Sequence, residues 1–199
     1  MQINVRNFLY KKYLFWYNVF KGWYKMFNKL KIVIIDKNYC NYLRKYDNKV
    51  PYNNNGKDLR PFIGILFMIN ELEYYAPLSS PKPKHFKMHN RLDFFKLDHG
   101  NLGSVNFNNM IPVSKLNYKI IDLTQSTNDI AFKKRLVLLR KQYYWLLDNF
   151  DYIKNNANKL YRLYINNKLN ESMYNRCCNF KLLEEKCNEY NKIKNDRIK

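Results

Sequence analysis

Residues 62–85 read FIGILFMINELEYYAPLSSPKPKH, and this stretch decides how the rest of the chain is interpreted. FIGILFMI (62–69) is a nearly continuous apolar run with the length of a buried strand, and ELEYYAPL (71–78) is its expected hairpin partner. SSPKPKH (79–85) cannot continue a sheet, because proline fixes φ and has no N–H group to donate. The stretch therefore predicts a buried hairpin that ends in a rigid turn.

Shorter strand patterns surround this hairpin, and helical patterns follow it. Further strands are expected at 32–36 (IVIID), 91–97 (RLDFFKL), 103–107 (GSVNF) and 117–123 (NYKIIDL). Helices are expected at 38–47, 129–149, 152–167 and 179–193, with Asn128 or Asp129 as the N-cap of the second. Strands first and helices later predict an α+β fold in which a compact, strongly curved, barrel-like sheet is elaborated by several helices.

Composition indicates a single nucleic-acid-binding domain. The chain has 199 residues, and 36 Lys and Arg against 16 Asp and Glu give a net charge of +20, which favours a polyanionic partner. Part of this basicity has a second explanation, because Lys, Asn, Tyr and Ile are all encoded by codons rich in A and T. The four cysteines show no metal-binding spacing, and no stretch reaches the roughly 18 apolar residues of a membrane span. We therefore expect reduced thiols, no metal, no stable membrane association and a cytoplasmic location.

The first thirty residues differ from the rest of the chain. They carry ten aromatic side chains and six Lys or Arg but no Asp or Glu. This composition fits either a basic amphipathic helix on a membrane or nucleic acid, or a misassigned start before Met26. The second interpretation is favoured, because the segment KLKIVIID reads as the first strand of a domain. We therefore divide the chain into an extension, 1–30, and a domain, 31–195.

Four segments occur in the same order as in a known toxin family. They are KIVIIDKNYCNYLRKYDNKVP (31–51), the stretch 62–85, LGSVNFNNMIPV (102–113) and CNFKLLEEK (178–186). Together they resemble the ToxN/AbiQ endoribonucleases of type III toxin-antitoxin systems. APLSSPK followed by a histidine, with MIP further on, is the most specific part of the resemblance.

The resemblance implies a fold similar to the Kid/MazF toxins and an RNA-cleaving enzyme without a cofactor. Cleavage in this family needs no metal and leaves a cyclic phosphate and a 5′-hydroxyl. The implied partners are cellular or phage mRNA as substrate and a pseudoknotted antitoxin RNA as inhibitor, in a closed assembly such as a 3:3 complex. The implied setting is a bacterium, in phage abortive infection or plasmid maintenance.

The resemblance also assigns candidate catalytic residues. Ser79, Ser80 and Lys82 match positions that line the family's active site. Hydroxyls and a cation suit RNA cleavage by its own 2′-hydroxyl, which needs alignment and charge stabilisation. Tyr52 and Arg60 stand nearest to a Tyr and a Lys that the preceding loop normally contributes, although the match is imperfect. Arginine is effectively never deprotonated, so Arg60 cannot be a general base.

Further residues are candidates for contacts with RNA phosphates or bases. They are Lys57, Lys84, His85, Lys87, Asn106, Asn109, Lys115, Lys133 and Lys134. Each has a plainer alternative: a solvated lysine, an asparagine that forms the turn around MIP, or, for His85, a structural hydrogen bond. The competing function is a non-catalytic RNA-binding module in which the SSPK segment is only a turn.

Overall fold

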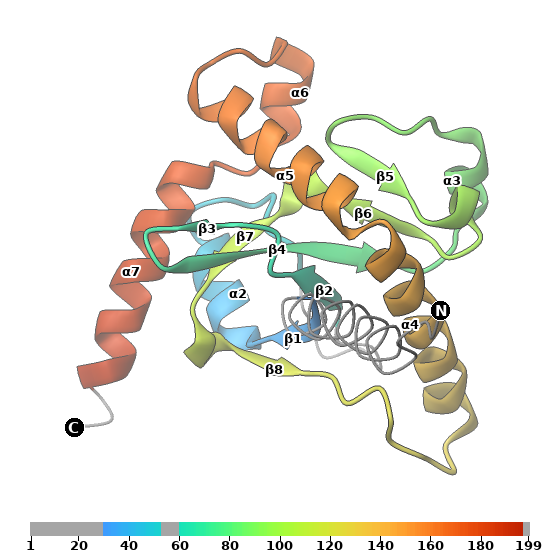
Figure 1. Ribbon diagram of the computed structural model, residues 1–199. Coiled ribbons are helices and arrows are strands. Elements are labelled where there is room, and N and C mark those ends of the chain that lie inside the picture. Colours follow the sequence, from blue (N-terminus) through green and yellow to red (C-terminus); the bar gives the residue numbers. More distant parts are fainter. Residues whose placement is uncertain (1–29, 53–59, 197–199) are drawn as a thin grey trace, which may run out of the picture.

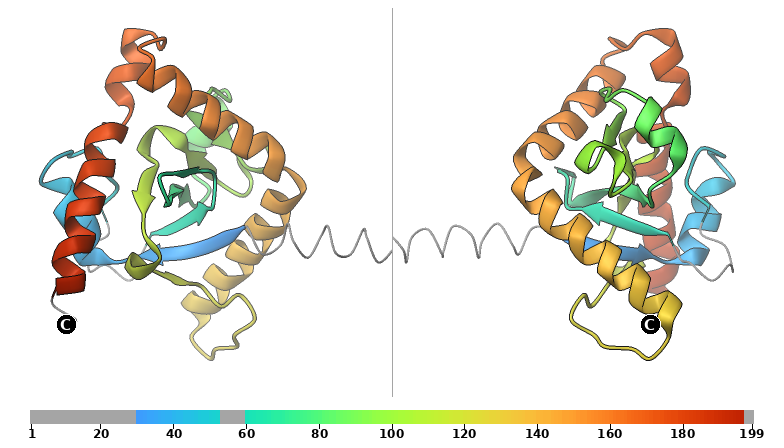
Figure 2. Two further views of the ribbon diagram at one scale, coloured as in Figure 1. Left: turned by 60° about the vertical axis from the view of Figure 1, so that its left-hand side comes forward. Right: turned by 90° about the vertical axis from the view of Figure 1, so that its right-hand side faces the viewer.

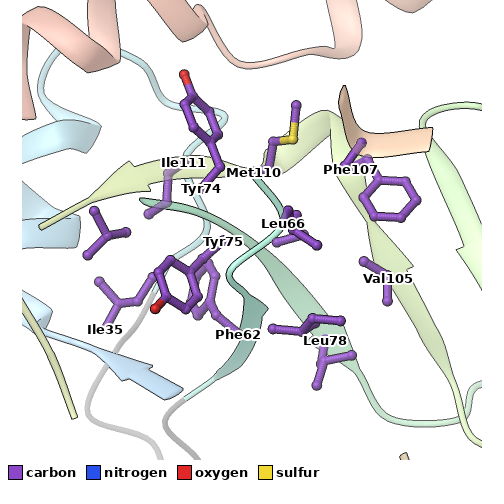
Figure 3. Packing of buried hydrophobic residues seen from close by; sticks show 14 of the residues in the cluster. Ile35, Phe62, Leu66, Tyr74, Tyr75, Leu78, Val105, Phe107, Met110 and Ile111 are labelled. Carbon is purple, nitrogen blue, oxygen red and sulfur yellow. The ribbon is translucent and has the colours of Figure 1, made fainter. Parts of the chain in front are cut away.

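Strand β4 (Leu72–Ser79) is the centre of the sheet in the computed structural model, which describes residues 30–52 and 60–196. It pairs with β2 (Pro61–Gly64), β3 (Met68–Ile69), β6 (Ser104–Asn106) and β7 (Ile111–Val113) at different points along its length. All residues of β4 except Ser79 are buried, and Figure 3 shows the neighbouring rings of Tyr74 and Tyr75 pointing to opposite sides. Cover on both faces explains why this segment is mostly apolar rather than alternating. Its buried charged residue, Glu73, accepts hydrogen bonds from the hydroxyls of Tyr75 and Tyr118.

The predicted hairpin is present, but its first strand is broken. The apolar run 62–69 divides into β2 and β3, because the chain bends between Gly64 and Met68. The ring of Tyr75 packs directly against Gly64. A Cβ on residue 64 would lie 2.5 Å from a Tyr75 ring carbon, so a larger residue would not fit there. Asn70 and Glu71, with φ of 46° and 68°, form the two-residue turn between β3 and β4.

The remaining strands extend the sheet on either side of β4. β1 (Lys31–Ile35), β5 (Phe94–Lys96) and β8 (Tyr118–Ile120) complete the order β5-β6-β4-β2-β1-β8, and the pairs are antiparallel. The α+β class is therefore confirmed, but the closed, strongly curved barrel is wrong. Among the described residues, β5 and β8 end the sheet without pairing with each other. With three residues each, they are too short to supply the staggered register that closure requires.

Helices enclose the sheet on three sides (Figure 1). They are α2 (Lys37–Arg44), α3 (Pro83–Lys87), α4 (Ile130–Asp148), α5 (Phe150–Ile165), α6 (Glu171–Arg176) and α7 (Phe180–Asp196). Asp129, one of the two predicted candidates, caps α4, and its carboxylate accepts the N–H groups of Ala131 and Phe132. Both views in Figure 2 show α4 and α5 running along one side of the sheet, with α7 on another.

Several local predictions need correction. The proline-rich turn after β4 leads into a five-residue helix, α3, because Pro83 suits the first turn of a helix. In the MIP segment, Ile111 and Pro112 belong to β7 rather than to a turn, and Met110 comes just before that strand. Helix α6 was not predicted at all. The short 3₁₀ helices η1 (Asp98–Gly100), η2 (Phe107–Asn109) and η3 (Lys115–Asn117) connect the later strands.

Two predictions lie outside the described residues, namely the extension before Leu30 and the RNA contact of Lys57. Within the part of the chain that the structure describes, no helix combines the length and the apolar character needed to cross a membrane.

Candidate active site

An open groove of about 880 Å³ lies between the end of β4 and the first half of α4. In Figure 1 the arrowhead of β4 points towards α4, with α3 just beyond it. Four of the five catalytic candidates line this groove, together with the candidate RNA contact Lys134. From the strands and the following turn come Arg60, Pro61, Leu78, Ser79, Ser80 and Lys82, and from α4 and its cap come Asp129, Ala131, Phe132, Lys134, Arg135, Leu138, Leu139 and Gln142.

The groove is strongly basic. Four cationic side chains line it, Arg60, Lys82, Lys134 and Arg135, against the single carboxylate of Asp129. That carboxylate already accepts the N–H groups of Ala131 and Phe132 in the first turn of α4. The net positive charge suits a phosphodiester backbone, whose counterions are released when cations replace them.

The backbone of Ser79 is held from two sides. The buried amide of Gln142, 2% exposed, donates through Nε2 to the carbonyl oxygen of Leu102 at 2.7 Å and to that of Ser79 at 3.3 Å. Gly103, with φ of +92°, passes so close that a Cβ there would lie 1.9 Å from the Ser79 carbonyl oxygen. Ser79 also pairs with Ser104 across the β4–β6 ladder. The hydroxyl-bearing end of β4 is therefore fixed against both α4 and β6.

Gln142→Leu should lower both stability and RNA cleavage. The substitution keeps the side-chain volume but leaves two partly buried carbonyl oxygens without the Gln142 donor, which costs about 1–3 kcal/mol of unfolding free energy. Urea denaturation and cleavage rates measure the two effects. Gln125→Leu is the matched control, because Gln125 donates to one backbone carbonyl in an exposed loop. If the two variants lost equal stability, the tether of Gln142 to Ser79 would have no energetic role.

Lys82 lies at the N-cap of α3 in an extended conformation, with φ of −139° and ψ of 145°. Its side chain is exposed and, among the described residues, makes no ion pair, so its charge faces the groove uncompensated. Its carbonyl oxygen accepts the N–H of His85 at 2.8 Å, which closes the first turn of α3. Pro81 and Pro83 stiffen the chain on both sides of Lys82.

His85 is buried rather than presented to RNA. Its side chain is 2% exposed, its Nε2 lies 3.5 Å from the Ser104 hydroxyl, and its Nδ1 has no partner among the described residues. Burial, and then the neighbouring Lys84 and Lys82, lower the pKa of the imidazole. We therefore interpret His85 as a residue that positions α3, which is the plainer of the two alternatives predicted from the sequence.

The lowered pKa of His85 predicts how the unfolding free energy depends on pH. The unfolded chain takes up a proton at this position at a higher pH than the folded chain does. The neutral form therefore stabilises the fold above a pH of about 6.5, and this contribution is lost as the pH falls towards the folded pKa. His85→Gln should lose less unfolding free energy than the wild type between about pH 7.5 and pH 5.5. His99→Gln, at an exposed position, should behave like the wild type; an unchanged pH dependence in His85→Gln would contradict this role.

The other candidates are dispersed. Tyr52 is exposed and lies outside the groove, with its ring 4.8 Å from the Arg44 guanidinium carbon. Lys84 and Lys87 are exposed on α3, and Lys133 is exposed on α4 beside the groove.

Three further candidates, Asn106, Asn109 and Lys115, do not line the groove. Asn109 donates its amide to the Lys49 carbonyl at 2.8 Å, which is a structural role, while Asn106 is half-buried at the end of β6. Lys115 is exposed in η3, whose residues Leu116 and Asn117 contact Lys194 of α7.

Sequence reasoning missed Arg135 and Gln142, which line the groove from α4 together with the predicted Lys134. Arg135 and Gln142 lie seven residues apart, two turns along one face of the helix. The run of three cations at 133–135 was a signal for Arg135, but the spacing alone could not show which face meets β4.

Comparison with known proteins identifies the family. The chain matches the family described as toxin ToxN of type III toxin-antitoxin systems over residues 31–188. The chain belongs to the ToxN toxin family. Endoribonuclease ToxN of Bacillus thuringiensis subsp. kurstaki is 35% identical over 164 residues, which cover 80% of this chain and 84% of that relative. The resemblance and the enzyme class predicted from the sequence, endoribonuclease, are thereby confirmed.

Two solved ToxN-family structures share the fold. One comes from work on selective toxin inhibition by a non-coding RNA pseudoknot; it has a TM-score of 0.69 and 33% identity, and the match covers 81% of this chain and 98% of that one. The other is AbiQ, a lactococcal anti-phage endoribonuclease of a type III system, with a TM-score of 0.69 and 26% identity over 82% of this chain and 98% of that one. The helices that enclose the sheet are thus part of a ToxN-like structure.

Proposed function

We propose that this chain is the RNA-cleaving toxin of a type III toxin-antitoxin pair and that it cuts RNA in the basic groove between β4 and α4. The observation that carries the proposal is the meeting of Ser79, Ser80 and Lys82 with Arg60 in one groove, because these residues come from separate segments. Residues 31–195 form the nuclease domain in this proposal, and residues 1–30 are an extension.

The proposed reaction uses the nucleophile of the substrate. The 2′-hydroxyl loses its proton and attacks the adjacent phosphorus, the bond from phosphorus to O2′ forms, and the bond to O5′ breaks as the 5′-oxygen takes up a proton. The products are a 2′,3′-cyclic phosphate and a 5′-hydroxyl end. Lys82 and Arg60 stabilise the negative charge that grows on the phosphorane, while the hydroxyls of Ser79 and Ser80 donate to its non-bridging oxygens. The contribution of the protein is alignment and charge, with no metal in the proposed step.

The proposed inhibitor is a pseudoknotted antitoxin RNA. An RNA that fills the groove competes directly with substrate, and the net charge of +20 supports binding of such a polyanion. From the sequence resemblance to the family, we also propose a cytoplasmic complex of closed form, such as 3:3, with a role in phage abortive infection or plasmid maintenance.

The experiment is an RNA cleavage assay with the purified full-length chain in the presence of EDTA. The expected products carry cyclic phosphate and 5′-hydroxyl ends, so a kinase labels the 5′ ends without prior phosphatase treatment. Expression without antitoxin should halt growth. Binding without cleavage across varied RNAs would reject the enzyme and favour the non-catalytic RNA-binding module.

A further inference from the structure

The outer face of α3 carries an exposed phenylalanine beside the proposed cutting groove. Phe86 is 56% exposed, whereas its neighbour His85 is buried against Ser104. Phe86 lies four positions after Lys82, which is the extended N-cap residue of α3 and lines the groove. A large apolar ring is thus presented to solvent one turn from a cation that lines the groove.

The chain around Phe86 is basic throughout. Residues 80–92 include Lys82, Lys84, Lys87 and Arg91 but no Asp or Glu. The next carboxylate along the chain, Asp93, is buried and paired with Arg176 at 2.8 Å. An aromatic ring among cations is the usual surface for single-stranded RNA, because bases stack on the ring while lysines contact phosphates.

We propose that Phe86 is a stacking subsite for an unpaired RNA base close to the scissile phosphate. The spacing supports this assignment, because one helical turn rises about 5.4 Å and a stacked strand advances about 3.4 Å per nucleotide. The base on Phe86 therefore belongs to a nucleotide one or two positions from the phosphate at Lys82. The inference rests on the proposed function for the location of that phosphate, but the stacking contact itself does not require cleavage.

The packing that holds α3 in place favours such a contact. His85 anchors the inner side of the helix, and its Cβ lies 3.4 Å from the position that a Cβ on Gly100 would take. Pro83 limits the backbone at the start of the helix. Because the ring stands on a rigid support, stacking a base on it orders few protein groups and loses little entropy.

The test uses short single-stranded RNAs that carry 2-aminopurine at successive positions, with a 2′-O-methyl group on the nucleotides to block cleavage. Wild-type protein should quench the fluorescence most strongly at one or two adjacent positions. Phe86→Ala should remove that quenching and weaken binding about tenfold, whereas Phe86→Tyr should retain both. Tyr46→Ala removes an exposed aromatic ring that follows α2, which lies on the opposite side of the molecule from α3 in Figure 1, and should match the wild type.

A second arm uses cleavable RNAs with one base removed at each position near the mapped cut. Loss of the stacked base should slow wild-type cleavage about tenfold and have no effect on Phe86→Ala, because the two changes remove the same contact. The subsite would be overturned if base removal slowed cleavage equally in the wild type and Phe86→Ala, or if the two proteins quenched 2-aminopurine equally. Quenching that depends on Phe86 without any RNA cleavage would instead reject the proposed enzyme and leave the subsite standing.

Discussion

Lys82→Ala should lower the rate of RNA cleavage by about 100- to 1,000-fold while leaving the melting temperature nearly unchanged. The ammonium group lies in the groove beside Ser79 and Ser80, where negative charge develops on phosphorus, and removing one preorganised donor of this kind costs about that factor. The side chain is exposed and, within the described residues, unpaired by any acid, so its loss disturbs no buried contact. Initial rates on a fluorogenic RNA measure the effect, with thermal denaturation alongside.

Lys87→Ala is the matched control for this experiment. It removes the same charge from an exposed position at the other end of α3, outside the groove lining. It should weaken RNA binding modestly and leave turnover of bound RNA close to wild type, because a distant phosphate contact acts on affinity. Similar rates for Lys82→Ala and the wild type would reject Lys82 as a catalytic residue.

Gly103→Ala should destabilise the protein by about 3 kcal/mol or more and abolish cleavage in the protein that still folds. Its φ of +92° is unfavourable for any residue with a Cβ, and the new carbon would also overlap the Ser79 carbonyl at 1.9 Å. Relief requires the end of β4 to move away from β6, and that movement carries Ser79 and Ser80 with it. Urea denaturation gives the stability, and cleavage per folded molecule gives the activity.

Gly100→Ala separates backbone strain from the overlap of the new Cβ with a neighbouring atom. Gly100 also has a positive φ, +106°, but a Cβ there would meet its nearest atom at 3.4 Å. It should therefore lose only about 1 kcal/mol, from backbone strain alone. Equal losses for the two variants would show that the contact with Ser79 adds nothing.

The elements that were predicted well are those with strong local signals. The buried hairpin around β4 follows from a long apolar run, and the start of α4 follows from Asp129, whose carboxylate has a short-range capping partner. The barrel was wrong because closure depends on the pairing and length of edge strands, which no local pattern fixes. The six-residue α6 was missed because so short a segment shows little periodicity, although Asn170 caps it.

Most of the predicted site residues lie on the β4 side of the groove, and Lys134 lies on the α4 side. Ser79, Ser80 and Lys82 stand in one segment, so a motif could identify them together. The opposite wall depends on how α4 docks, and Gln142 looks like an ordinary polar residue of a helix until its bonds to Leu102 and Ser79 are seen. His85 was ambiguous for the same reason, since burial is set by η1 and β6 rather than by its neighbours in sequence.

The groove joins two segments that are far apart along the chain, the end of β4 and the start of α4. An RNA that contacts both segments binds only the native protein, because unfolding separates the two segments. Mass action then adds about 2.7 kcal/mol of stability when free RNA reaches a hundred times its dissociation constant. Under this proposal, the release of antitoxin that liberates the enzyme also lowers its melting temperature, so that the active form is the more fragile one.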